Sequence, residues 1–159
     1  MPYLIDGHNL IPKLGLTLDD PQDEIKLIER LQVFCRLRQT QVEIYFDGGI
    51  AGQPKIHNYG SVKAHFVRNR KIANAADAAI ESRLIKLGRS AQNWSVVSSD
   101  HRVQSAAREV HARVFSSDEF ARMVAEARTA QSIQKKTEAN LSPEDVSEWM
   151  DIFNTPKQE

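Results

Sequence analysis

The chain has 159 residues, which is enough for one domain with a buried core. Its 21 basic and 21 acidic side chains give a formal net charge of zero, so bulk charge argues neither for nor against a nucleic-acid partner. Because Cys35 is the single cysteine, disulfide frameworks and Cys-based zinc sites within one chain are excluded.

Short apolar runs predict five strands that alternate with helices. The strands are expected at residues 3–5, 42–46, 62–67, 94–98 and 113–115, the last being the weakest. The helical spacing of apolar residues predicts helices over residues 27–35, 76–87, 103–110 and 120–127. Ser116 and Glu119 precede the last helix with the spacing of a capping box. This alternation predicts an α/β fold, a three-layer α/β/α sandwich around a central, mainly parallel sheet.

Three stretches depart from this alternation. Residues 48–61 contain four glycines and one proline and show no helical spacing, so we expect a long loop there. A domain over residues 1–128 is expected to end in a polar linker over residues 129–141. Residues 142–153 open with a serine and a proline suited to a helix start and carry one apolar face. This short amphipathic C-terminal helix is expected to dock on the domain, on a second copy of the chain as a homodimer contact, or on another partner.

The sequence also bears on location. The N-terminus lacks the basic and apolar regions of a signal peptide. No uncharged run approaches the ~20 residues that a membrane span needs. Together with the single cysteine, these features predict a cytoplasmic protein without a membrane partner.

Acidic residues follow three of the predicted strands. Asp6 ends the first strand, Asp47 the second and Asp100 the fourth. Asp77 lies in the first turn of the helix that precedes the fourth strand, and Glu81 follows one helical turn later. Because the carboxyl ends of parallel strands meet at one edge of a sheet, we expect these side chains to face a common site.

Clustered carboxylates point to a divalent cation. They repel one another unless something compensates their charge. Mg²⁺ prefers oxygen ligands, and such an ion can lower the pKa of a bound water and neutralise charge on a phosphoryl oxygen. We therefore expect a metal site formed by Asp6, Asp77 and Asp100, with Asp47 as a fourth ligand and Asn9 as a residue that orients a ligand or a water.

Each of these acidic residues also has a purely structural interpretation. An Asp after a strand is a common turn residue or helix N-cap, which applies to Asp47 in "DGG" and to Asp100 before a helix. Asp77 would stabilise the helix dipole from its first turn, and Glu81 would lie on a solvated helix face. A structural role explains Asp6 least, because the following Gly-His-Asn turn does not need the acid.

A basic region lies between the second strand and the helix that carries Asp77. Residues 48–76 contain no Asp or Glu, and their candidate RNA-binding residues are Lys63, Arg68, Arg70 and Lys71. A basic loop beside an acidic pocket suits a polyanion whose phosphate is drawn to a metal ion. The alternative is a solvated loop without a ligand.

Four segments resemble a known family. They are "YLIDGHNLI", "FDGG", "NAADAAIESRL" and "VVSSDHRVQSAAR", in this order. The chain resembles the NYN branch of the PIN-like nuclease superfamily, and most closely the YacP-like group of small bacterial proteins, over roughly residues 2–128. This resemblance implies a parallel-sheet α/β/α sandwich and a Mg²⁺- or Mn²⁺-dependent ribonuclease. Some YacP-like proteins are linked to ribosome-associated mRNA cleavage.

The resemblance also implies roles for single residues. The acids that match the family's metal site are Asp6, Asp77 and Asp100, and Asp47 matches an acid often seen after the second strand. Asn9 and Ser99 match supporting residues of the family, and Glu81 is a further supporting candidate from its place one turn after Asp77. His8 departs from the family pattern, because the group often has a Tyr at this place in the turn.

Two functions remain open after these observations. The first is endonucleolytic, metal-dependent hydrolysis of RNA phosphodiester bonds, with ribosome-associated mRNA cleavage as a specific form. The alternative is a module that binds RNA or a ribosome without cutting. A receiver domain needs adjacent acids after its first strand, and haloacid-dehalogenase chemistry needs Asp-x-Asp. The Asp6-Gly7-His8 sequence fits neither.

Overall fold

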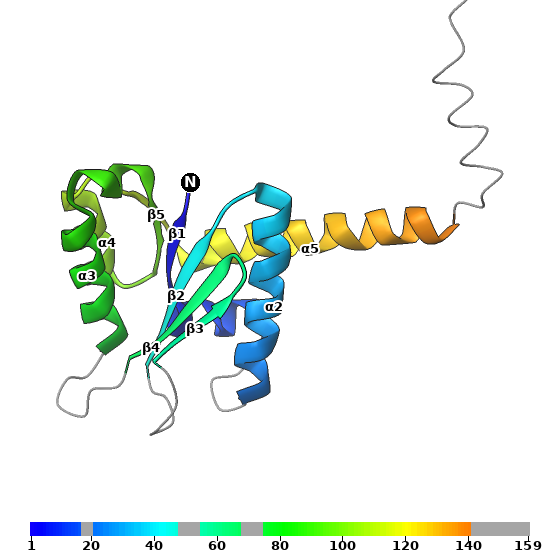
Figure 1. The fold of residues 1–159 in the computed structure, drawn as a ribbon, viewed down its shortest axis with the longest axis horizontal. Coiled ribbons are helices and arrows are strands. Elements are labelled where there is room, and N and C mark those ends of the chain that lie inside the picture. Colours follow the sequence, from blue (N-terminus) through cyan, green and yellow to red (C-terminus); the bar gives the residue numbers. More distant parts are fainter. Residues whose placement is uncertain (17–20, 48–54, 68–74, 141–159) are drawn as a thin grey trace, which may run out of the picture.

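The computed structural model describes residues 1–16, 21–47, 55–67 and 75–140 and is shown in Figure 1. Its strands are β1 (Tyr3–Asp6), β2 (Val42–Asp47), β3 (Ile56–Tyr59), β4 (Val62–Val67), β5 (Ser95–Val97) and β6 (Arg113–Phe115). Its helices are α1 (Gly7–Leu10), α2 (Pro21–Arg38), α3 (Ala75–Leu87), α4 (His101–Glu109) and α5 (Ser117–Asn140). Two short 3-10 helices, η1 (Pro12–Leu14) and η2 (Gly88–Asn93), complete the described elements.

The strands form one sheet in the order β3-β4-β2-β1-β5-β6. All neighbours are parallel except β3, which runs antiparallel to β4. This arrangement confirms the expected mainly parallel sheet, and the five predicted strands are present with ends shifted by at most one residue. The chain builds outward from β1 to β2 and β4 and then crosses to β5 on the other side of β1. In open α/β sheets, ligands bind beyond the carboxyl ends of the strands at such a reversal of order.

The stretch expected to be one long loop contains a strand. Residues 56–59 pair with β4, with Tyr59 opposite Val62, and Gly60 adopts a positive φ of 67° in the tight connection. The expectation of a loop over residues 48–61 is therefore wrong for its second half, while residues 48–54 lie outside the described residues. The sequence gives little sign of this strand, because four residues at a half-exposed sheet edge leave only a short alternating pattern.

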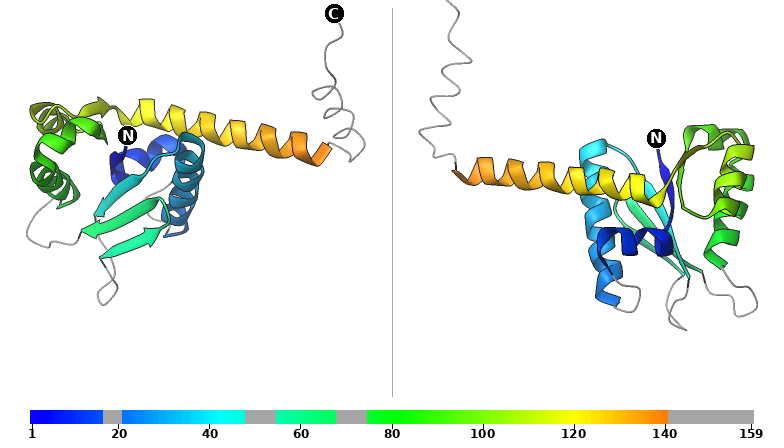
Figure 2. Two further views of the ribbon diagram at one scale, coloured as in Figure 1. Left: turned by 45° about the horizontal axis from the view of Figure 1, so that its top comes forward. Right: turned by 180° about the vertical axis from the view of Figure 1, so that it is seen from behind.

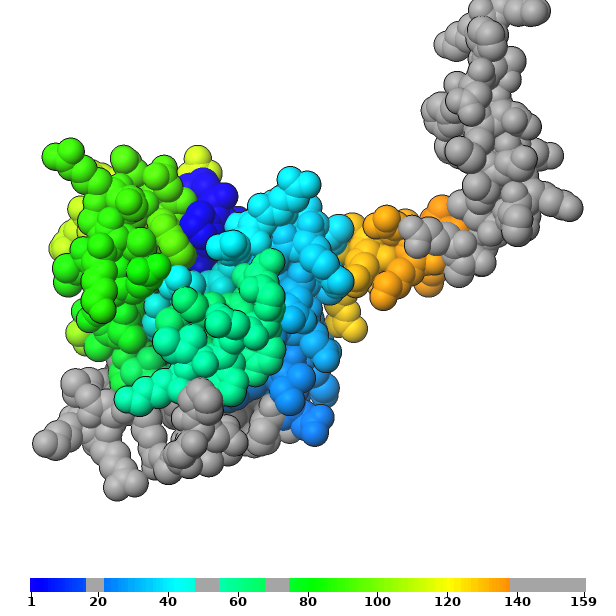
Figure 3. Space-filling view, viewed as in Figure 1, coloured from blue at the N-terminus to red at the C-terminus, as the bar shows by residue number. Residues whose placement is uncertain are grey.

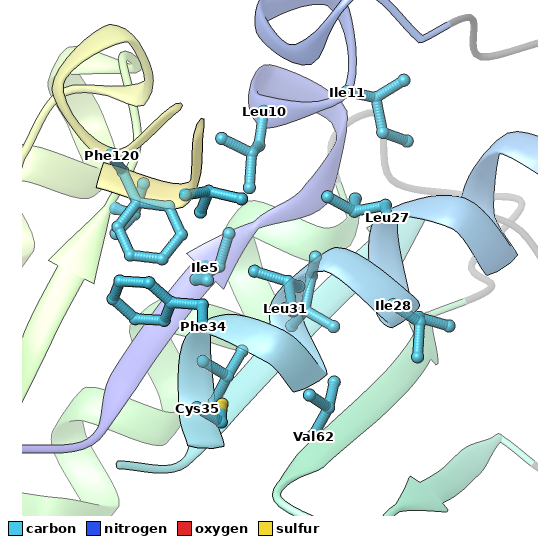
Figure 4. Close-up of a cluster of buried hydrophobic side chains, with 14 of the residues drawn as sticks. Ile5, Leu10, Ile11, Leu27, Ile28, Leu31, Phe34, Cys35, Val62 and Phe120 are labelled. Atoms are coloured by element: carbon cyan, nitrogen blue, oxygen red, sulfur yellow. The ribbon is translucent and has the colours of Figure 1, made fainter. Parts of the chain in front are cut away.

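Helices cover both faces of the sheet, as the two views of Figure 2 show. On one face, α1, α2 and α5 enclose a core that includes Ile5, Leu31, Phe34 and Phe120, drawn in Figure 4. The apolar stripe predicted over residues 27–35 is the buried side of α2 in this core. Burial of each large apolar side chain contributes about 1.5–3 kcal/mol to stability, so packing on this face holds the strands and their ends in place.

The opposite face of the sheet is covered by α3 and α4. Leu4, Tyr45 and Val96 from the strands contact Ile80 and Leu84 of α3 in a second core. Because successive residues of a strand point to opposite faces, Leu4 and Ile5 are buried in different cores. This double coverage explains the continuous apolar sequence of β1 and confirms the three-layer sandwich.

Helix α5 begins as the sequence predicts. Oγ of Ser116 accepts a hydrogen bond from the main-chain N–H of Glu119 (3.1 Å). The carboxylate of Glu119 accepts one from the main-chain N–H of Ser116 (3.0 Å). The capping box is therefore confirmed, with two main-chain donors at the helix start satisfied reciprocally.

The same helix continues far beyond its expected end. It has 24 residues, and residues 129–140, which were expected to form a polar linker, are helical. They contain neither Gly nor Pro, so nothing in their sequence interrupts the helix. Figure 3 shows that the C-terminal half of α5 reaches past α2. Within the described ranges, no helix combines the length and the apolar character needed to cross a membrane.

The C-terminal helix expected over residues 142–153 lies outside the described residues. The three-part division of the chain into a domain over residues 1–128, a linker and this helix therefore stays a prediction. The structure adds one fact about the expected linker, which is that residues 129–140 are helical. Because an α-helix rises about 1.5 Å per residue, a continuous helix carries the chain away from the domain by that distance with each residue.

Candidate active site

Asp6 lies at the end of β1, where the order of the strands reverses, and its side chain is only 3% exposed. Its Oδ2 accepts a hydrogen bond from Nδ2 of Asn9 (2.6 Å) and a longer one from Oγ of Ser98 (3.4 Å). Ser98 falls beside Asp6 because β1 and β5 pair with Ile5 opposite Val97, one residue earlier in each strand. Donors from α1 and from the end of β5 thus fix the orientation of one buried carboxylate.

The turn after Asp6 requires glycine at position 7, because there is no room for a Cβ atom there. A Cβ on Gly7 would lie 2.6 Å from ring carbons of Phe46 and 2.9 Å from the carbonyl oxygen of Tyr45. Both atoms belong to the buried middle of β2, so neither can easily move away. His8 adds a second connection, since its Nε2 accepts a hydrogen bond from the main-chain N–H of Asp47 (3.1 Å). The glycine therefore lets α1 lie against β2 and present its polar groups at the sheet edge.

Asp77 provides a second buried carboxyl group, in the first turn of α3, and is 8% exposed. Burial raises the pKa of Asp77 to about 7, and its hydrogen bond with Asp6 and the negative charges of Asp6, Asp100 and Asp47 act in the same direction. A hydrogen bond between two carboxyl groups requires a proton on one of them. The pair of Asp6 and Asp77 thus needs either a proton or a cation to be stable.

Asp47 and Asp100 are engaged at the starts of helices. Oδ1 of Asp100 accepts a hydrogen bond from the main-chain N–H of Arg102 (2.8 Å), so Asp100 is the N-cap of α4. Oδ1 of Asp47 accepts one from the main-chain N–H of Ala76 (2.7 Å), in the first turn of α3. The structural interpretation of Asp100 is therefore confirmed, while Asp47 serves a helix start and not only a turn. A metal role for either residue stays a prediction.

Two residues expected to support the site have other partners. Oγ of Ser99 accepts a hydrogen bond from a main-chain N–H at the start of α5 (3.1 Å). Glu81 forms an ion pair with Arg102 at 2.6 Å, so it is not simply a solvated residue. The serine beside Asp6 is Ser98, which was not among the candidates. Only the register between β1 and β5 identifies Ser98 as the neighbour of Asp6, and a single sequence does not reveal that register.

Lys63 is the one described member of the predicted basic group. It is the second residue of β4 and lies opposite Glu43 of β2 and Asn58 of β3. With Trp94 it borders a pocket of about 210 Å³ toward the amino ends of the parallel strands. Lys63 is therefore at the end of the sheet opposite to Asp6. The other three candidates, Arg68, Arg70 and Lys71, lie outside the described residues.

The oxygen groups around Asp6 and Asp77 fit a hard divalent cation. Mg²⁺ keeps several waters and is often held by only one or two carboxylates. In the part of the chain that the structure describes, no three His, Cys, Asp or Glu side chains converge to hold an ion by themselves. The chemistry therefore suits a hydrated Mg²⁺ or Mn²⁺ at the Asp6–Asp77 pair, where its charge would replace the shared proton.

Comparisons with known proteins agree with this architecture. The family model for the "YacP-like NYN domain" matches residues 3–154. The crystal structure of the W164L mutant of Rae1 (YacP) from Bacillus subtilis has a TM-score of 0.70 at 22% identity, covering 93% of this chain and 89% of that chain. A second crystal structure of Rae1 (YacP) from Bacillus subtilis has a TM-score of 0.64 at 22% identity, covering 95% and 93%. No curated protein sequence matches the chain.

Proposed function

Because this chain belongs to the YacP-like NYN domain family, we propose that it is a metal-dependent endoribonuclease acting at the Asp6–Asp77 pair. The nuclease-type fold of the family supports hydrolysis of phosphodiester bonds. The observation that carries the proposal is the burial of two interacting carboxyl groups, Asp6 and Asp77, at the reversal of strand order. Perturbed titratable groups of this kind concentrate at functional sites.

The described residues divide the work of the site. Asp6 and Asp77 would hold Mg²⁺ or Mn²⁺, and Asn9 and Ser98 keep the Asp6 carboxylate in one orientation. The negative charge of Asp100 acts on Asp77 and would add to the attraction for a cation. When bound, the ion would supply Lewis-acid stabilisation of the charge that develops on the phosphoryl group.

The substrate class that we propose is RNA, with mRNA at the ribosome in the cytoplasm as its specific form. The resemblance of the "DGHN" and "VVSSDH" segments to YacP-like proteins supports this choice. A module that binds RNA or a ribosome without cutting is the second candidate. The engagement of Asp47 and Asp100 in helix starts favours it, because two of the four expected metal ligands already have main-chain partners.

A cleavage assay separates the two candidates. Purified protein is incubated with end-labelled single-stranded RNA in Mn²⁺ or in EDTA, and in parallel with mRNA on translating ribosomes. We expect products in Mn²⁺ and none in EDTA, since the reaction needs the cation. Asp6→Asn should remove the products while keeping the circular dichroism spectrum. The exposed Glu109→Gln provides a matched exchange of a carboxylate for an amide.

Two outcomes would argue against the nuclease. Cleavage by Asp6→Asn at the full rate in Mn²⁺ would contradict the assignment of the site. Retention of RNA without EDTA-sensitive products on either substrate would favour the binding module. Loss of cleavage in Glu109→Gln would show that the assay reports general damage to the protein.

A further inference from the structure

A groove of about 1000 Å³ lies between η1, α2 and α5. In the view from behind in Figure 2, α5 passes the segment that contains α1 and η1, crosses α2 and extends beyond it, and α5 contacts all three elements. Five cationic side chains line the groove, namely Lys13, Arg30, Arg122, Arg128 and Lys136. Among the described lining residues the one acid is Asp118, which forms an ion pair with Lys13 at 3.3 Å. The groove therefore carries a clear excess of positive charge in a chain that has none overall.

The cations are held near one another from different elements. The guanidinium of Arg30 donates a hydrogen bond to the carbonyl oxygen of Leu14 (3.0 Å), which ties α2 to η1. Burial lowers the pKa of Arg30, and the positive charge of Arg128 on α5 lowers it further, while Asp23 acts in the opposite direction. Like charges brought together in this way repel each other, and an anion bound between them would relieve the repulsion.

The position of the groove connects it to the candidate active site. It begins at Lys13, four residues after Asn9, and α1 itself contacts α5. From Arg122 to Lys136 the lining of α5 extends over about 21 Å at 1.5 Å per residue. Cations spread over this length, on elements that contact α1, suit a polyanion whose charges are distributed along a chain.

We propose that this groove binds the phosphates of the RNA strand on one side of the bond that is cleaved. The inference rests on the proposed function, since it takes RNA as the substrate. Arginine presents a planar fork of donors that matches phosphate, and three of the five cations are arginines. The exposed Ile133 (61%) and the partly buried Leu14 offer apolar surface for sugars and bases between the charges. The predominance of arginine, with its fork of donors, favours a nucleic-acid backbone over an acidic protein segment.

The test measures RNA binding without cleavage. Fluorescent single-stranded RNA is titrated with the full chain in EDTA, at several salt concentrations, and binding is followed by anisotropy. Arg122→Gln/Arg128→Gln removes two exposed charges from the groove. Arg108→Gln/Arg113→Gln removes two exposed arginines on α4 and β6, outside the groove, and is the matched control.

We expect the groove variant to bind RNA roughly tenfold more weakly at low salt, with a salt slope smaller by about 1.4, since each phosphate contact to a single strand contributes about 0.7. The control variant should bind like the unaltered protein. In Mn²⁺, the groove variant should show a raised KM and an unchanged kcat, because it loses binding contacts and not groups at the reacting bond.

Equal affinity and equal salt slope in the groove and control variants would overturn the inference. So would retained RNA affinity together with lost binding of poly-glutamate, which would make the groove a site for an acidic protein segment. Because EDTA prevents metal-dependent cleavage, the binding experiment tests the groove independently of the proposed nuclease activity. If the protein never cleaves RNA but the groove variant binds RNA more weakly, the groove is an RNA-binding site and the proposal of a nuclease is wrong.

Discussion

Four carboxylates lie at the same edge of the sheet, but they form two different pairs. The inner pair, Asp6 and Asp77, is buried, and this burial, together with the interaction with Asp6, raises the pKa of Asp77 to about 7. The outer pair, Asp47 and Asp100, accepts hydrogen bonds from main-chain donors at the starts of α3 and α4. Hydrogen bonds to helix starts therefore account for the outer pair, whereas the inner pair brings two buried carboxyl groups together, beyond what the place of Asp77 in the first turn of α3 explains. This difference locates the candidate chemistry within a cluster that looks uniform in the sequence.

The largest effect should separate the two pairs by activity. Asp77→Asn removes an inner charge, and we expect cleavage of RNA in Mn²⁺ to fall about a thousandfold, which corresponds to about 4 kcal/mol of transition-state stabilisation. Asp47→Asn keeps an oxygen that can accept the hydrogen bond from Ala76, so its rate should change less than tenfold. Initial rates on one labelled RNA measure both. Equal losses in the two variants would remove the distinction between the pairs.

The second effect is the pH dependence of stability in the absence of metal. The pKa of Asp77 is raised from 3.8 to about 7, so between these pH values the folded chain binds more protons at this site than the unfolded chain. The contribution of Asp77 to the free energy of unfolding is then fully present below pH 4 and is lost as the pH rises through 7. Each pKa unit corresponds to about 1.4 kcal/mol, which sets the loss at up to about 4 kcal/mol.

Urea unfolding in EDTA at several pH values tests this sign. Asp77→Asn has no charge to acquire, so its stability relative to the unaltered protein should increase from pH 4 to pH 8. Addition of Mn²⁺ at pH 8 should reduce this advantage, because an ion bound to the folded state stabilises only the protein that retains the carboxylate. A difference that stays constant with pH would show that the inner pair does not share a proton.

The third effect changes the packing of the turn after Asp6 without changing any carboxylate. Gly7→Ala would place a Cβ against Phe46 and the carbonyl oxygen of Tyr45, and we expect a loss of about 1–3 kcal/mol in the free energy of unfolding. Gly60→Ala is the matched exchange, since Gly60 has a φ of 67° but, among the described residues beyond its chain neighbours, no atom lies within 4 Å of an added Cβ. It should cost about 1 kcal/mol from backbone strain alone. A smaller loss for Gly7→Ala than for Gly60→Ala would contradict the close approach of α1 and β2.

Features of the site that depend on neighbouring residues were predictable from the sequence. Asp6 at the end of an apolar run and the capping box of Ser116 and Glu119 are local patterns, and the structure contains both. The cap formed by Asp100 is local as well, because it depends on a residue two positions later. Such features follow from strand and helix geometry without knowledge of the fold.

Features that depend on pairing between distant segments were not predictable. Ser98 reaches Asp6 only because β1 and β5 have a particular register, and Asp47 reaches Ala76 only because α3 starts beside the end of β2. The basic groove joins η1, α2 and α5, so its cations are spread over more than 120 positions of the sequence and form no basic run. A shift of one residue in a strand would place Ser99 at the site in place of Ser98, and composition alone does not decide between them.

The smallest effect tests the outer pair itself. Asp100→Ala removes the oxygen that accepts the hydrogen bond from Arg102, and loss of such a cap should lower the free energy of unfolding by about 1 kcal/mol. Asp100→Asn keeps an acceptor and should stay within a few tenths of a kcal/mol in urea unfolding. The asparagine variant thereby removes the charge of Asp100 while keeping its structural role. If it also lost cleavage at unchanged stability, Asp100 would belong with the inner pair, because only its charge would have changed.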